Sequence, residues 1–184
     1  MTPRERVLKT ASKLFYAEGV RAVGVDRIVA ESGVSKMTLY RHFPSKDELV
    51  VAVLEARDEP ALAVMRAAAE AAGPDPRAAL LAPFQGLEFW FTSGRFRGCP
   101  FMNASLELAD PGHPARAVAE RHKTATRDHF ASLTAELGVS DTEALADQLA
   151  LIFDGAIAQA QMRDPVLVAR AAVSAATALI DAAR

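Results

Sequence analysis

The stretch from Val20 to Leu54 constrains the fold of this chain most, because its breaks and caps leave room only for short helices in a fixed order. Before it, an apolar stripe predicts a first helix over residues 3–18, ended by a glycine. A second helix should begin after Gly24 and end at Gly33, which permits a sharp turn. The segment therefore predicts two helices joined to a third by a tight turn.

The third short helix has distinct inner and outer faces. Ser35 is placed as its N-cap, and Pro44 stops it. Leu39 and Phe43 are four residues apart, so both should anchor the helix to the core, with Val34 beneath the turn. The side chains left on the outer faces are Lys36, Met37, Thr38, Tyr40 and Arg41. A braced short helix with such an outer surface fits the major groove of DNA.

The outer surface and its flanks carry groups that DNA contacts require. Thr38 has a hydroxyl and a methyl group, and the Tyr40 phenol can reach a phosphate. Lys46 lies in the first turn of the next helix, where Ser45 and Glu48 form an S-x-x-E capping box. There its ammonium and the free backbone N–H groups can bind one phosphate. The predicted DNA-contact residues are Gly24, Ser35, Lys36, Met37, Thr38, Tyr40, Arg41, His42 and Lys46.

Two alternatives remain open for this surface. The charged side chains also suit a solvated face of an ordinary helical bundle. Met37 suits contact with a thymine methyl group and suits packing equally well.

The segment Val34–Leu49 resembles the N-terminal DNA-binding domain of TetR-type (tetracycline-repressor-like) transcriptional regulators. The resemblance covers roughly the first 50 residues and extends back through Phe15, Gly19, Ile28 and Gly33. It implies a helix-turn-helix domain over residues 1–47 and a helical ligand-binding and dimerisation domain over residues 48–184. It also implies a dimer that binds a palindromic operator, and a fourth helix that moves when a ligand binds.

The chain departs from the family pattern at two places. Val23 and Gly24 stand where the family often has Thr or Ser, so the side-chain phosphate contact is lost there and only a backbone contact is left. Met37 occupies a position that is commonly Gly, Ala or Pro in the family.

The rest of the chain predicts further helices and no strand, hence an all-α fold of about nine helices. A fourth helix starts at Lys46 and should kink or end a segment at Pro60. Ser140 and Glu143 form a second capping box. Further helices are expected, separated by Gly and Pro breaks, over residues 61–72, 76–92, 100–108, 114–137, 141–163 and 165–182.

Composition bounds the class of protein. The chain has no run of about 18 apolar residues and no apolar signal-peptide core, which predicts neither a membrane span nor secretion. A single cysteine, Cys99, fits a reducing cytoplasm. Residues 1–50 hold nine Lys and Arg against six Asp and Glu, whereas the remainder holds twelve against seventeen. The basic excess lies where DNA contacts are predicted.

The last two long helices are rich in small residues and apolar over more than one face. A helix needs such a wide apolar surface when it is covered on two sides. We therefore expect one side to meet its own domain and another to meet a second copy, as a homodimer. A single larger core within one subunit is the alternative.

Aromatic side chains cluster between residues 84 and 101, as in an apolar small-molecule site. Aromatic residues at helical spacing also suit a plain core. Asp154 interrupts an apolar helix, so a buried carboxylate there needs a partner. The predicted ligand-binding residues are Phe84, Gln85, Trp90, Phe101, Met102, Asn103, His122 and Asp154, with Glu107 and Gln161 as further polar candidates.

Sequence motifs give little support to an enzyme. No nucleophile elbow, phosphate-binding loop, dinucleotide motif or metal-ligand spacing occurs, so neither catalytic residues nor a cofactor or metal is predicted. The favoured function is a ligand-responsive regulator that represses transcription and is released from DNA by a small apolar or amphipathic molecule. The alternatives are a constitutive DNA-binding module, and a helical enzyme or carrier with an interaction head.

Overall fold

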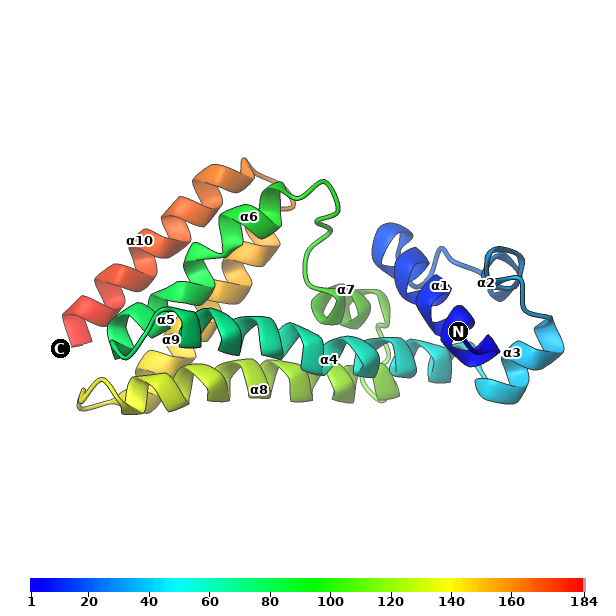
Figure 1. The fold of residues 1–184 in the computed structure, drawn as a ribbon, viewed down its shortest axis with the longest axis horizontal. Helices are drawn as coiled ribbons and strands as arrows, with labels where there is room; N and C mark the ends of the chain where they lie inside the picture. Colours follow the sequence, from blue (N-terminus) through cyan, green and yellow to red (C-terminus); the bar gives the residue numbers. More distant parts are fainter. Residues whose placement is uncertain (184) are drawn as a thin grey trace. The chain divides into compact units, whose positions relative to one another are not determined.

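A computed structural model describes residues 1–183, and the described chain is all-helical, as predicted (Figure 1). Its helices are α1 (Pro3–Glu18), α2 (Val25–Ser32), α3 (Lys36–His42), α4 (Lys46–Ala71), α5 (Pro76–Gln85), α6 (Leu87–Thr92), α7 (Pro100–Glu107), α8 (Pro114–Ala135), α9 (Thr142–Gln159) and α10 (Pro165–Ala183). The described residues thus form ten helices. The tenth arises because the helix expected over residues 76–92 is divided at Gly86, a weak helix former.

The chain divides into two compact units, and the division falls within α4. The first unit joins Met1–Glu59 to Cys99–His122, and the second joins Pro60–Gly98 to the residues from Lys123 onward. Helix α4 continues through Pro60, so the proline does not end it as one reading of the sequence allowed. The boundary between the DNA-binding domain and the ligand-binding domain, placed between residues 47 and 48, stays a prediction, because a compact unit is not a functional domain.

In the first unit, α1, α2 and α3 pack on one another. The predicted stripe on α1 is confirmed, because its buried side chains are Val7, Ala11, Leu14 and Phe15. A reciprocal capping box that the sequence analysis did not single out fixes the start of α1. The Thr2 hydroxyl accepts from the Glu5 backbone N–H at 3.2 Å, and a Glu5 carboxylate oxygen accepts from the Thr2 N–H at 2.8 Å.

In the second unit, α10 packs against α5, α6 and α9. Its aromatic core brings together Phe84, Phe130 and Phe153, with ring centroids 5.5–5.8 Å apart. Trp90 lies beside Phe91 and Phe96 in a second cluster. Both clusters have the separations of ordinary aromatic packing.

Two predicted helix ends need correction. The start of α9 is capped by Asp141, whose carboxylate accepts from the Ala144 N–H at 3.0 Å, so the capping box predicted at Ser140 is wrong. Helix α9 ends at Gln159 rather than at residue 163. At the starts of α5 and α10, the carboxylates of Asp75 and Asp164 each accept from a backbone N–H two residues later.

Candidate nucleic-acid interface

Helix α3 is held from behind by the side chains that the sequence predicted. Gly33 adopts φ +63°, a left-handed conformation that lets the chain turn sharply between α2 and α3. Leu39 is fully buried, and Phe43 and Val34 are nearly so. Burying these apolar groups fixes which side of the seven-residue helix faces its own unit.

The opposite side of α3 faces outward. Met37 is 79% exposed and Tyr40 is 40% exposed, and Lys36 and Arg41 are exposed as well. Thr38 and His42 are half-buried. The predicted contact residues of α3 are therefore exposed or half-buried, and none of them is buried. The structure contains no DNA, so their contacts with it stay a prediction.

Two local interactions orient the polar groups at the start of α3. The Ser35 hydroxyl accepts from the Thr38 N–H at 3.2 Å, which confirms Ser35 as the N-cap, and it lies 2.9 Å from the Thr38 hydroxyl. The Lys36 ammonium donates to the Asp26 carboxylate of α2 at 2.7 Å. This hydrogen bond raises the pKa of Lys36.

The flanks of α3 supply further groups. The Glu48 N–H donates to the Ser45 hydroxyl at 3.1 Å, which gives α4 the predicted cap, and half-buried Lys46 is the first residue of that helix. Gly24 is the exposed N-cap of α2 and makes no side-chain cap bond, which agrees with the departure from the family pattern. A phosphate contact there would have to come from backbone N–H groups.

Sequence reasoning did not single out two residues of this region, Asp26 and Arg4. Asp26, in the first turn of α2, pairs with Lys36, the first residue of α3. The Arg4 guanidinium lies 5.2 Å from the centroid of the Phe43 ring, a cation–π distance.

The predicted ligand-binding residues fall into two groups. Phe84, Gln85, Trp90 and Asp154 belong to the second unit. Phe84 is fully buried in the aromatic core, whereas Gln85 is exposed. Asp154 is half-buried, and its carboxylate has a partner, as expected for a carboxylate within an apolar helix. The Lys123 ammonium donates to it at 2.5 Å.

The other four predicted residues, Phe101, Met102, Asn103 and His122, belong to the first unit. The Phe101 ring stacks on His122, with 3.7 Å between the centroids. The Nδ1 atom of His122 lies 2.8 Å from an oxygen of Asp58. Met102 and Asn103 are half-buried on α7. This group therefore combines a buried aromatic stack, a His–Asp pair and the half-buried amide of Asn103.

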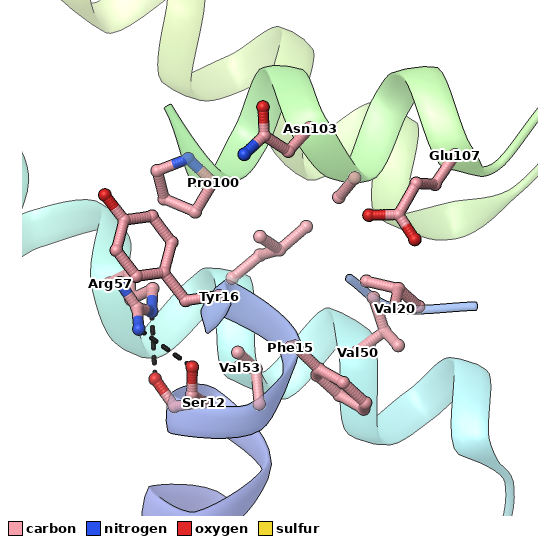
Figure 2. A pocket seen from close by; sticks show the side chains of 12 residues that line it. Ser12, Phe15, Tyr16, Val20, Val50, Val53, Arg57, Pro100, Asn103 and Glu107 are labelled. Carbon is pink, nitrogen blue, oxygen red and sulfur yellow. Dashed lines mark hydrogen bonds between the residues drawn. The ribbon is translucent and has the colours of Figure 1, made fainter. Parts of the chain in front are cut away.

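A cavity lies among α1, α4 and α7, within the first unit (Figure 2). Of the eight predicted ligand-binding residues, Asn103 alone lines it. Helix α1 contributes Ser12 and Tyr16, neither of which was among the predicted ligand-binding residues. Arg57 of α4 and Glu107 of α7 are its charged lining residues.

Large apolar side chains are exposed on α9, on α10 and between them in the second unit. Leu151 of α9 is 73% exposed, and Leu167 of α10 and Met162, which lies between the two helices, are mostly exposed as well. Among the described helices, α10 is long and apolar enough to cross a membrane by length and composition. Such apolarity is equally what a helix needs when it is covered on two sides.

Comparison with known proteins gives the family of this fold. The family model described as bacterial regulatory proteins, tetR family, matches residues 7–53. Two solved structures match the chain nearly throughout. A TetR-family transcriptional regulator from Streptomyces coelicolor is 35% identical, with a TM-score of 0.91, over 98% of this chain and 89% of that one. A putative TetR transcriptional regulator from Streptomyces avermitilis is 37% identical, with a TM-score of 0.90, over 100% and 98%.

A curated relative agrees with these structures. The HTH-type transcriptional regulator YjdC of Escherichia coli is 26% identical over 156 residues, which are 85% of this chain and 82% of that protein. Three observations point to the same family. Helix α3 is held by its inner side and is polar on its outer side, the family model covers α1–α3, and two solved structures match nearly the full chain. The chain belongs to the TetR family of transcriptional regulators and carries its DNA-binding domain at the N-terminus.

Proposed function

We propose that this regulator is a ligand-responsive repressor that binds a palindromic operator as a dimer in the cytoplasm. The observation that carries the proposal is the outer side of α3, where exposed Lys36, Tyr40 and Arg41 are backed by buried Leu39. One seven-residue helix reads few base pairs, so two copies set one helical turn apart are needed for specificity.

The outer surface of α9 and α10 supports the dimer. Leu151 and Gly155 are four residues apart on one side of α9, and both are exposed. A Cβ atom added at Gly155 would meet nothing within 4 Å. Exposed Gly in a helix interior destabilises the helix by about 1 kcal/mol relative to Ala, and close approach of a second helix is a reason to keep it.

In the proposed mechanism, a small apolar or amphipathic molecule favours a state of the dimer in which its two N-terminal DNA-binding domains no longer match the spacing of the operator half-sites. A ligand can do this only by binding one conformational state more tightly than the other. Helix α4 begins at Lys46, shortly after α3 ends. Four of its residues line the cavity: Val50, Val53, Leu54 and Arg57. A ligand in contact with α4 would therefore act on the helix that follows α3 in the chain.

Selection from randomised DNA tests the proposal. The wild-type dimer should enrich an inverted repeat whose half-sites lie about 34 Å apart, one helical turn. Arg41→Ala should relax or change the base preference at one position in each half-site. It removes a base contact, and such a contact discriminates against the wrong base by about 1–3 kcal/mol. Arg163→Ala, which removes an exposed charge from the second unit, should select the wild-type motif. Enrichment of no motif by the wild type would refute operator binding, and an unchanged motif for Arg41→Ala would exclude that residue from base readout.

Lys46→Ala should weaken binding to all DNA sequences by a similar factor. A phosphate contact carries no base preference, and each one contributes about 0.9 to the slope of log K against log salt concentration. Fluorescence anisotropy at several salt concentrations should therefore give a shallower slope for Lys46→Ala than for wild type and the matched Arg163→Ala control. Tyr40→Phe removes only a neutral hydroxyl group, so it should also weaken binding to all DNA sequences, through the lost hydrogen bond to phosphate. An unchanged affinity and slope would rule out the phosphate role of the residue replaced.

A constitutive regulator without a ligand is a second candidate. The fully buried Phe84 and Phe130 rings fill the aromatic core of the second unit, where the sequence analysis expected ligand-binding groups. Operator binding that no molecule in a broad effector screen alters would favour this candidate over the ligand-responsive repressor.

A further inference from the structure

The guanidinium of Arg4 lies at the junction between α3 and α4. Arg4 belongs to the first turn of α1, and its Cζ atom lies 5.2 Å from the centroid of the Phe43 ring. Phe43 directly follows His42, the last residue of α3, and Lys46 begins α4 shortly afterwards. The start of α1 therefore lies beside the end of α3 at which His42 and Lys46 are predicted to contact DNA (Figure 1).

Arg4 is exposed, and no acidic group of the protein neutralises its charge. Among the described residues, no carboxylate forms an ion pair with Arg4, whereas Arg27 of the same unit pairs with two glutamates. The neighbouring carboxylate of Glu5 accepts from the Thr2 N–H at 2.8 Å and so serves the cap of α1. A cation–π contact with Phe43 uses the face of the ring and leaves the N–H donors of the guanidinium free.

We propose that Arg4 binds a DNA phosphate at the same end of α3 as Lys46, so that the DNA interface includes the first turn of α1. A helix in the major groove is flanked by the two sugar–phosphate backbones, and cations at its ends are placed to contact them. A guanidinium can donate two parallel N–H groups to the oxygens of one phosphate. Because the Phe43 ring already restrains the side chain, binding costs less conformational entropy. The contact rests on the proposed binding of DNA through α3.

Fluorescence anisotropy of the full-length protein with its selected operator, at several salt concentrations, tests the contact. Arg4→Gln should weaken binding roughly tenfold at low salt, the loss expected for one charge-assisted contact. The slope of log K against log salt concentration should become shallower by about 0.9 for each protomer bound. Arg4→Lys keeps the charge, so it should retain most of the slope while it loses the paired donors. Unrelated DNA should show the same change in slope, because a phosphate carries no base preference.

The matched control is Lys13→Gln, which removes an exposed cation from the same helix. Nine residues are two and a half turns, so Lys13 lies on the opposite side of α1 from Arg4 and about 13 Å along the helix. Both variants lose one positive charge, but Lys13→Gln should keep a slope close to that of the wild type. An unchanged slope for Arg4→Gln, or equal losses for the two variants, would overturn the proposal.

Operators that carry a single neutral methylphosphonate locate the contact on the DNA. Neutralising the phosphate that Arg4 binds should weaken wild-type binding by about the factor that Arg4→Gln does, and should weaken binding of Arg4→Gln no further. Such a double-mutant cycle isolates a pairwise contact, whereas a variant that only loosens the fold would lose the same factor on both operators. Additive losses at every phosphate of the half-site would overturn the proposal.

The failure of this contact and the failure of the proposed function are distinguishable. A wild-type protein that selects an operator, with a shallower slope for Lys46→Ala and an unchanged slope for Arg4→Gln, contradicts the Arg4 contact alone. A wild-type protein that binds no DNA contradicts the proposed function and the contact together. A lower midpoint of thermal unfolding for Arg4→Gln, with an unchanged slope, would show that Arg4 only packs on Phe43 and would overturn the proposal.

Discussion

Replacing Leu39 by Ala is expected to lower the free energy of unfolding of the first unit by about 2–5 kcal/mol, the range for truncating a fully buried leucine. Leu39 has no exposed surface, and it is the buried residue of a helix only seven residues long. A helix this short is not stable alone, so its conformation depends on packing against α1 and α2. Operator affinity should fall with stability, because a loosened α3 no longer presents its outer side in one geometry.

Met37→Ala is the matched control for Leu39→Ala. It truncates another large apolar side chain of α3, but Met37 is 79% exposed, so the free energy of unfolding should change by less than about 0.5 kcal/mol. Urea denaturation, together with hydrogen exchange of the α1–α3 amides, separates the first unit from the second. If Leu39→Ala proved as stable as Met37→Ala, α3 would not be held by its inner side, and the basis for assigning its outer side to DNA would be lost.

The N-terminal fold could be predicted from the sequence because its signals are local. Ser35 caps the helix it begins, and Gly33 supplies the turn before it. Each of these positions acts on residues within one helical turn, so sequence spacing specifies the outcome. The same reasoning failed at Ser140, where a polar residue one position later, Asp141, was an equally good acceptor and became the cap. Local rules identify a helix start to within a residue or two when several caps adjoin.

The cavity could not be predicted because its lining comes from three helices that are far apart in the sequence. Ser12, Arg57 and Asn103 meet only after α1, α4 and α7 have packed together. Composition directed attention to the aromatic cluster instead, and Phe84 of that cluster is part of a filled core. The Lys36–Asp26 ion pair was missed for a related reason: the turn at Gly33 brings together residues that neither helix places side by side alone.

Replacing Leu151 by Glu is expected to dissociate the proposed dimer. The interface of a two-fold dimer uses the same surface twice, so one substitution introduces two buried charges. If each disrupted contact costs about 2 kcal/mol, as hot-spot residues do, the dimer dissociation constant rises roughly a thousandfold. Sedimentation equilibrium should then show monomers at concentrations where the wild type is dimeric. Operator affinity should fall in parallel, because a single α3 reads only one half-site.

The control substitution is Leu106→Glu, which makes the same chemical change on α7. Leu106 is 81% exposed and Leu151 is 73% exposed, so neither change should unfold a protomer. Only the change on α9 should alter the molecular mass in solution, because Leu106 belongs to the first unit. A Leu151→Glu protein that remains dimeric, with unchanged operator affinity, would show that the exposed surface of α9 serves another purpose. The same outcome would leave exposed Gly155 without a structural reason for its lack of a side chain.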